Sequence, residues 1–446
     1  MNFKILRYVF IVSMAGFLMG FDTVVISGVN LPIKNLWHTS DWFHGTFIIS
    51  MSLWGMVVGA LSGGYPTEKL GRKMTLIMVG LLFSLSALGA ALSQGPYYFS
   101  VFRFLGGLAA GFASIAAPSY ISEISDAKNR GRLAMLYQFN IVFGILIAYL
   151  SNYLLKGLYH ENDWRLMLGI EFFPAILFTL LLFSVPQSPR WLLVCKNQAD
   201  KARLILRTTM SESEAENCIQ QINSDVKTVA NTKSGLFSGK YKKVLLLSFL
   251  MAFFNQFSGI SFILFYAPEI FGKAGLGASE SLLSSISIGI INLIFTFAGI
   301  YLIDKAGRRT LMFIGSWGYI ISLSMVAFGF YFHASPSFML TFILLFIASH
   351  AIGQGAVIWV FIPEIFPTRI RSFGQAWGSG LLNLFAAVIA LLGAVLINAF
   401  APWMVFGFFA FFMVIQLLFT LFMMPETKGI PLEKIEQQLI SSVKGK

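Results

Sequence analysis

The chain has 446 residues, of which 57% are hydrophobic and 12% are charged, and its formal net charge is +12. Soluble domains carry about 25% charged residues, so this composition excludes an ordinary soluble protein and indicates a helical membrane protein. The basic residues are spread over short segments between apolar runs, which argues against a nucleic-acid surface.

Twelve apolar runs divide the chain, each long enough for the ~20 residues of a membrane-spanning helix. They lie near residues 6–30, 44–66, 74–93, 98–122, 133–155, 165–186, 243–271, 280–302, 310–332, 338–364, 372–398 and 403–424. We therefore predict an all-α membrane protein with twelve transmembrane helices in two six-helix bundles. No small-residue cleavage site follows the first run, which favours a retained helix over a signal peptide.

A polar segment separates the sixth run from the seventh and is predicted to form short cytoplasmic helices. We expect an N-terminal bundle over residues 1–187, a helical linker over 188–242, a C-terminal bundle over 243–424 and a cytoplasmic tail over 425–446. Cys195 and Cys218 both fall in the linker. They are too few for a zinc site, and a reducing compartment argues against a disulfide.

The basic residues indicate the topology. Most of the 32 lysines and arginines precede the first run, follow an even-numbered run, or lie in the linker and tail. The opposite loops hold Lys34, Lys156, Arg165 and Lys273. The positive-inside rule therefore predicts that both termini are cytoplasmic, with anionic lipid headgroups as contacts.

The two halves repeat a pattern in which an acid precedes an arginine at the inner ends of the helices. The four instances are Glu68 with Arg72, Glu123 with Arg130, Asp304 with Arg308, and Glu364 with Arg371. This duplication predicts two similar bundles with the substrate between them near the midplane. The charges could pair across helix ends and latch the inner side, or they could reflect positive-inside placement alone.

Asp22 lies well inside the first apolar run, and Arg103 lies inside the fourth. Each alone costs about 2.5–3.5 kcal/mol on insertion scales, so the two are expected to neutralise one another if their helices are neighbours. Small residues over 106–111 allow the fourth helix to pack closely. Protonation of Asp22 would release Arg103, which couples a proton to conformation. The alternative is a structural ion pair in a passive carrier.

The seventh run carries uncharged polar residues at a depth without water, namely Asn255, Gln256, Ser258 and Ser261 around Gly259. Their spacing of three predicts one helical face. Amide and hydroxyl groups suit a neutral polyhydroxylated ligand better than an ion. The alternative is that they bond neighbouring helices.

Taken together, these motifs resemble the sugar porter family of the major facilitator superfamily over nearly the whole chain. The segments that carry the resemblance are 64–73, 103–111, 123–132, 186–191, 255–268, 304–309, 363–371 and 425–429. Asp22 and Arg103 stand where the proton-coupled members of the family have their coupling pair. Passive facilitators carry a neutral residue in place of Asp22.

The resemblance also implies a sugar site and a gate. The sugar ligands are Gln138, Asn255, Gln256, Ser261, Asn292, Trp359, Ser379 and Asn383, and the gating residues are Phe265 and Tyr266. The ring of Trp359 would stack on a pyranose. The chain departs from the family pattern at Asn255 (usually Gln), Ser261 (usually Asn), Ser379 and Gly380 (Gln and Trp in a proton-coupled member of the family), and Gln187 (usually Glu).

The expected activity is proton symport of a neutral monosaccharide, a hexose or pentose, by alternating access in the bacterial cytoplasmic membrane. Alternatives are a passive sugar uniporter, a cyclitol (inositol)–proton symporter, a sugar-sensing receptor and a drug–proton antiporter. No nucleophile–base pair, phosphate-binding loop or metal motif stands out, so we expect neither an enzyme nor a cofactor or metal. The partners expected are the sugar, the proton and membrane lipids, and the protein is expected to be a monomer.

Overall fold

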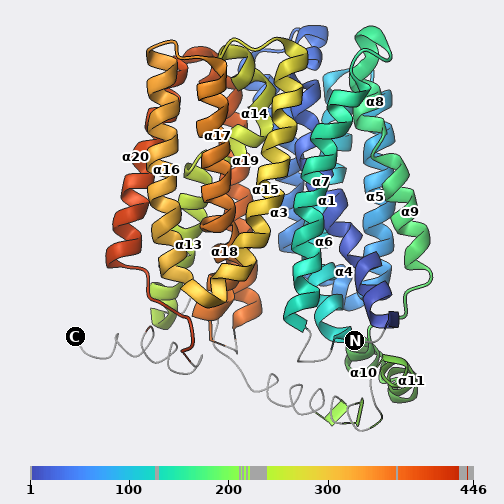
Figure 1. Cartoon of the computed structure of the whole chain (residues 1–446). Helices are drawn as coiled ribbons and strands as arrows, with labels where there is room; N and C mark the ends of the chain where they lie inside the picture. Colours follow the sequence, from blue (N-terminus) through green and yellow to red (C-terminus); the bar gives the residue numbers. More distant parts are fainter. Residues whose placement is uncertain are drawn as a thin grey trace. The chain divides into compact units, whose positions relative to one another are not determined.

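The computed structural model describes residues 3–125, 130–209, 239–367 and 370–430, with isolated residues between 212 and 220 and residue 439. At residues 130, 131, 208, 209, 371 and 372 it describes the backbone alone. Every element in these residues is a helix (Figure 1), which confirms the all-α prediction.

Within each half of the chain, the described helices follow one another closely along the sequence. Those of the first half are α1 (Phe3–Trp37), α2 (Asp41–Phe43), η1 (His44–Ile49), α3 (Met51–Ser62), α4 (Gly64–Lys69), α5 (Arg72–Leu92), α6 (Pro96–Ile124), α7 (Arg130–Leu155), η2 (His160–Asn162), α8 (Asp163–Gly169), α9 (Phe172–Leu182), α10 (Pro189–Lys196) and α11 (Ala199–Thr209). Those of the second half are η3 (Gly239–Tyr241), α13 (Lys242–Phe257), α14 (Ile260–Lys273), α15 (Ala278–Ala306), α16 (Arg308–Tyr331), α17 (Pro336–Ile352), α18 (Gln354–Ile365), α19 (Arg371–Ala399) and α20 (Pro402–Phe422).

Within the described residues, eleven helical segments are long and apolar enough to cross a membrane. A bent pair, Asp41–Ile49 with Met51–Ser62, brings the number to twelve if it counts as one span, and its two parts meet at 42°. Each predicted apolar run overlaps one of these segments. α10 and α11 are the predicted short helices after the sixth span.

Two of the long spans are interrupted at glycines. Gly259 lies between α13 and α14 with φ of 87°, and a Cβ there would lie 2.8 Å from the Phe409 ring. Gly353 lies between α17 and α18, and a Cβ there would lie 3.0 Å from the Gly315 Cα. Glycine adopts the left-handed φ at position 259 without strain, and at both positions it leaves room for the neighbouring atoms.

One compact unit contains residues 1–23, 54–145 and 168–233. In it α5 packs against both α6 and α9 (Figure 1). A Cβ on Gly111 of α6 would lie 2.6 Å from the Ala60 backbone nitrogen of α3. The small residues of the fourth span therefore let its backbone approach a neighbouring helix.

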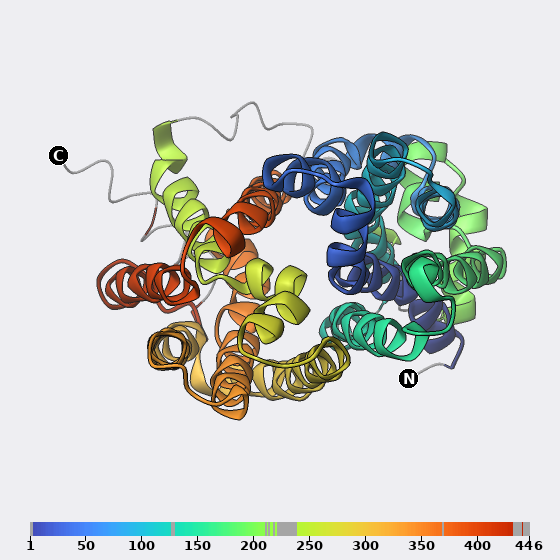
Figure 2. The same cartoon turned by 90° about the horizontal axis from the view of Figure 1, so that it is seen from above.

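The other compact unit contains residues 24–53, 146–167 and 234–446. α16 packs against α17 and α20, and these gold-to-red helices lie side by side in the view along the helices (Figure 2). In the same unit, Tyr149 Oη of α7 donates a hydrogen bond of 2.8 Å to the Leu264 carbonyl of α14. The final turns of α1 and α7 thus pack with the second half of the chain.

Candidate functional site

Asp22 and Arg103 meet inside the first compact unit. Arg103 Nη1 lies 2.5 Å from Asp22 Oδ1, and Nη2 donates a bond of 2.9 Å to the Asp22 backbone oxygen. Their side chains are 1% and 2% exposed. Glycine at position 106 leaves room for this approach, because a Cβ there would lie 3.1 Å from Asp22 Oδ1. The two predicted intramembrane charges are therefore neighbours in a dry environment.

A second buried carboxylate, Glu171, lies next to this pair. It directly precedes α9, is 2% exposed, and is close enough to feel the charges of Asp22 and Arg103. Within the described residues, Glu171 Oε1 and Arg103 Nε are buried atoms without a hydrogen-bond partner. Glu171 was not among the site residues predicted from the sequence, although an acid inside the sixth apolar run was a visible signal.

The polar residues of the seventh span form a small cluster of side chains. Gln256 Nε2 donates to Asn255 Oδ1 at 3.0 Å, and Ser261 Oγ donates to Gln256 Oε1 at 2.5 Å. The exposed fractions of the three residues are 5–7%. The cluster bridges the break between α13 and α14, since Asn255 and Gln256 end one helix and Ser261 begins the next.

The expectation of one continuous helical face was wrong at Ser258. Its Oγ donates to the Asn255 backbone oxygen at 2.6 Å and accepts from the Ile260 nitrogen at 3.3 Å. Ser258 therefore satisfies backbone groups at the helix break, as serine does at a cap. The reason is Gly259, whose positive φ ends α13 before the face could continue.

The other predicted sugar ligands lie on four helices. Asn292 on α15 is 9% exposed, whereas the Trp359 ring on α18 is 46% exposed. Ser379 and Asn383 on α19 are half-buried. Gln138 on α7 is also half-buried and belongs to the first compact unit. The structure thus brings Asn255, Gln256 and Ser261 into mutual contact and leaves the roles of the others as predictions.

The two predicted gating residues lie at a kink in α14. Phe265 and Tyr266 are 3% and 1% exposed, and Tyr266 has φ of −114° and ψ of 16°. Tyr266 Oη donates a bond of 2.7 Å to the Ala390 carbonyl of α19. Pro268 explains the kink, because it has no N–H for the Leu264 carbonyl one turn earlier. That carbonyl accepts the Tyr149 hydroxyl instead.

The repeated acid–arginine motifs form two ion pairs of the same design. Arg72 Nη2 lies 2.8 Å from Glu123 Oε1, which matches the 2.8 Å between Arg308 Nη2 and Glu364 Oε1. Each glutamate also accepts a hydroxyl, from Ser188 at 2.5 Å in the first unit and from Thr427 at 2.6 Å in the second. The duplication therefore has a third member, the hydroxyl residue after the sixth and twelfth spans.

Glu426 precedes this threonine and holds the start of α16. Its carboxylate accepts the backbone N–H groups of Arg308 and Arg309 at 3.0 Å, and those of Thr427 and Lys428 at 2.9 Å. Burial alone would raise the pKa of Glu426, but these backbone N–H groups together lower it below its usual value. At the corresponding place the first half has Gln187, whose buried Oε1 has no partner among the described residues.

The remaining residues of the predicted charge network make fewer contacts that the structure describes. Asp304 is 77% exposed and lies 3.3 Å from Arg308 Nη1 one helical turn away. Glu68 is exposed, and the side chains of Arg130 and Arg371 lie outside the described residues, so their predicted pairs are not described. Cys195 is a free, exposed thiol and Cys218 lies outside the described residues. Among the described side chains, no three His, Cys, Asp or Glu residues group as metal ligands.

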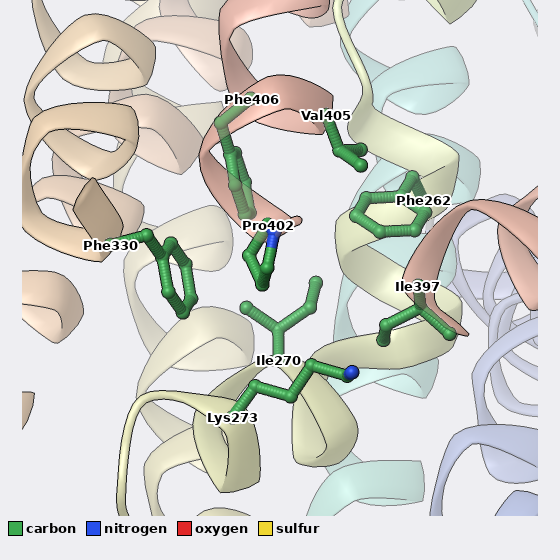
Figure 3. Close-up of a pocket in the computed structure, with 8 residues that line it drawn as sticks. All are labelled: Phe262, Ile270, Lys273, Phe330, Ile397, Pro402, Val405 and Phe406. Atoms are coloured by element: carbon green, nitrogen blue, oxygen red, sulfur yellow. The ribbon is translucent and has the colours of Figure 1, made fainter. Parts of the chain in front are cut away.

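A small cavity in the second unit can be excluded as a sugar site. Its volume is about 10 Å³, near the minimum for a single water molecule. Figure 3 shows apolar side chains around it and the stem of Lys273. The lining residues are Phe262, Ile270, Lys273, Phe330, Ile397, Pro402, Val405 and Phe406.

Comparison with known proteins places this geometry in a family. The family model described as "Sugar (and other) transporter" matches residues 8–439. The glucose transporter GlcP of Staphylococcus epidermidis is 34% identical over 430 residues, which cover 96% of this chain and 95% of the relative. The D-xylose-proton symporter of Escherichia coli strain K12 is 32% identical over 466 residues, which cover 96% and 94%.

A solved structure agrees with these relatives. The inward-open structure of the xylose transporter XylE from E. coli matches with a TM-score of 0.87 at 30% identity, covering 98% of this chain and 100% of that chain. These relatives are transporters and not enzymes. The chain therefore belongs to the sugar transporter family, the sugar porters of the major facilitator superfamily.

Proposed function

We propose that the protein imports one neutral monosaccharide, a hexose or pentose, together with one proton by alternating access. The observation that carries the proposal is the buried Asp22–Arg103 pair with the buried Glu171 beside it. A passive carrier has no need for a buried ion pair and a further buried carboxyl group in a dry helix bundle, where such groups are costly. Among the relatives, those from E. coli named as D-xylose and galactose symporters are proton-coupled.

The proposed coupling step is a change of partner for Arg103. With Asp22 ionised, Arg103 is held by its carboxylate and its backbone oxygen. A proton on Asp22 weakens the first bond, and Glu171 then offers its unpartnered oxygen to the unpartnered Arg103 Nε. One pH unit supplies about 1.4 kcal/mol, and 100 mV supplies about 2.3 kcal/mol per charge moved.

The amide cluster of the seventh span is the proposed centre of the sugar site. Within the cluster, Ser261 and Asn255 hold both ends of the Gln256 amide, so its orientation is set before a ligand arrives. Each amide NH₂ group has two donors, so a second N–H of Gln256 and the NH₂ of Asn255 are available for sugar hydroxyls. Preorganised donors of this kind reduce the entropy cost of binding.

The proposed arrangement in the membrane has both termini in the cytoplasm. It rests on the concentration of lysine and arginine before the first span, after the even-numbered spans, and in the linker and tail. The segments 1–187 and 243–424 are the proposed moving bundles. The Arg72–Glu123–Ser188 and Arg308–Glu364–Thr427 networks then lie at the inner ends of the helices, where they would latch the inner side.

The deciding experiment separates symport from passive uniport. Sugar added to vesicles that contain the protein is expected to alkalinise the medium, and the sugar is expected to accumulate against its gradient. A passive uniporter would equilibrate the sugar with no pH change. A thermal-shift screen of the purified protein against hexoses, pentoses and inositols identifies the substrate and tests the cyclitol alternative, because α19 carries the small residues Ser379 and Gly380.

A further inference from the structure

A chain of hydrogen-bonded polar side chains joins the C-terminal part of α1 to the C-terminal part of α14. The Glu269 carboxylate accepts a hydrogen bond from the Asn30 Nδ2 group. Asn30 Oδ1 lies 2.5 Å from His44 Nε2, and His44 Nδ1 lies 2.9 Å from Thr39 Oγ1. All four residues belong to the second compact unit. Asn30 and His44 are 2% and 1% exposed, while Glu269 is partly exposed.

The direction of these bonds follows from the chemistry of each group. Asn30 donates to the carboxylate with its nitrogen, so its oxygen faces His44 and needs a donor. His44 must then carry its proton on Nε2, which leaves Nδ1 to accept from the Thr39 hydroxyl. In this pattern Glu269 only accepts, as an ionised carboxylate does. Within the described residues its hydrogen-bond partner is a neutral amide, and it has no ion-pair partner.

The same four residues can form a second complete pattern after one proton is added. A protonated Glu269 donates to Asn30 Oδ1 once the amide has rotated by half a turn. The Asn30 NH₂ then donates to His44 Nε2, and the tautomer with the proton on Nδ1 donates to Thr39 Oγ1. Because both patterns keep all three hydrogen bonds among these four residues, the network accepts and releases a proton without losing any of those bonds.

The charged groups around Glu269 are few and mostly paired. Lys34 on α1 lies 2.5 Å from Asp41 on α2, and Asn398 of α19 donates to the same Asp41 oxygen at 3.0 Å. The groups on α14 itself that interact with Glu269 are Lys273 and the Tyr266 phenol. The Lys34 charge is therefore largely balanced, and Glu269 faces one further lysine one turn away.

We infer that Glu269, Asn30 and His44 form a second proton-binding site at the proposed outer end of the protein, distinct from Asp22. The partly exposed carboxyl of Glu269 takes up the proton from the outer medium, and Asn30 and His44 reorganise around it. The inference deepens the proposed function, since the outward location rests on the proposed topology. The proton itself is bound whether or not Asp22 couples transport.

The experiment detects protonation of the Glu269 carboxyl group by infrared spectroscopy. Infrared difference spectra of the purified full-length protein are recorded across a pH titration for D22N and for D22N/E269Q. The D22N background removes the Asp22 carboxyl, and Glu171 contributes equally to both proteins. We expect a titrating carboxyl C=O band in D22N that is absent from D22N/E269Q. Superimposable spectra would overturn the inference and would leave the proposed coupling at Asp22 untouched.

Two further variants complete the test. E280Q is the control, because Glu280 is an exposed acid at the start of α15, and its loss should leave the Glu269 band in place. N30L removes both bonds of the amide but keeps its size. The ionised carboxylate loses the stronger bond, so the midpoint of the Glu269 titration should rise by about one pH unit. An unchanged midpoint would contradict the network, even if E269Q failed to fold.

Discussion

Arg103 holds Asp22 at two points, the carboxylate at 2.5 Å and the backbone carbonyl at 2.9 Å. The second bond does not depend on the charge of Asp22. Neutralising the carboxylate therefore weakens the contact without abolishing it, and the helices α1 and α6 stay joined. This arrangement lets the charge of Asp22 be tested by mutation without dismantling the bundle.

The first prediction concerns Asp22→Asn. The asparagine keeps an acceptor for Arg103 but cannot bind and release a proton, so uphill sugar accumulation should be lost while counterflow exchange is spared. Uptake into energised vesicles and exchange in proteoliposomes measure the two activities. D304N is the control, because Asp304 is 77% exposed and outside the pair. Accumulation by D22N at the wild-type level would remove Asp22 from the mechanism.

The second prediction concerns Glu171→Gln. The variant is neutral and can no longer serve as the second anionic partner of Arg103, so proton-driven uptake should slow about tenfold, equivalent to ~1.4 kcal/mol in the barrier. Sugar affinity should change by less than about twofold, since Glu171 belongs to the buried charge cluster and not to the amide cluster. Binding by calorimetry and uptake by isotope flux separate these effects. Wild-type uptake in E171Q would exclude the change of partner.

The third prediction concerns the sugar site. Gln138→Ala and Gln256→Ala should each weaken sugar binding by about 1–3 kcal/mol, the cost of leaving sugar hydroxyls and neighbouring groups unpaired. Ser261→Ala should weaken it as well, because Gln256 loses the hydroxyl that orients it.

Ser258→Ala is the matched control for this series. Its hydroxyl bonds the backbone at the helix break, so its loss should lower the melting temperature and leave the sugar affinity unchanged. The sugar dissociation constants of Q138A, Q256A, S261A and S258A test this prediction. If Q138A and Q256A both bind sugar as the wild type does, the site lies elsewhere.

The fourth prediction concerns Glu426 and pH. Its pKa in the folded protein lies below the unfolded value of about 4.3, so its stabilising effect is present above that pH and is lost as the pH falls through the lower folded value. Glu426→Gln should therefore lower the melting temperature at pH 7, and the difference from wild type should shrink in acid. Thermal unfolding across this pH range measures it. A difference that is constant with pH would show that charge is not the cause.

Much of the fold could be predicted because a bilayer leaves few options for the backbone. Each apolar run had to become a helix, so the number and order of the spans followed from the sequence. The pairing of Asp22 with Arg103 was also accessible, since each lone charge needed a partner. The amides of the seventh span were identified by polarity alone.

Other features required the three-dimensional structure. The helix break at Gly259 turned Ser258 to the backbone and placed Ser261 on Gln256, which a regular helical spacing does not predict. The contacts of Ser188 with Glu123 and of Thr427 with Glu364 join residues more than sixty positions apart. Glu171 was a different case, because its position in an apolar run was visible and its neighbours were not.

Pro268 leaves the Leu264 carbonyl without its helical partner, and the Tyr149 hydroxyl takes that place from another helix. Any movement that draws α14 away from α7 strips this carbonyl of its bond, at a cost of about 1–3 kcal/mol in a dry surrounding. Water is the natural replacement. Separation of α14 from α7 therefore requires water to reach the Leu264 carbonyl. While water is excluded, the hydrogen bond from Tyr149 keeps the two helices together.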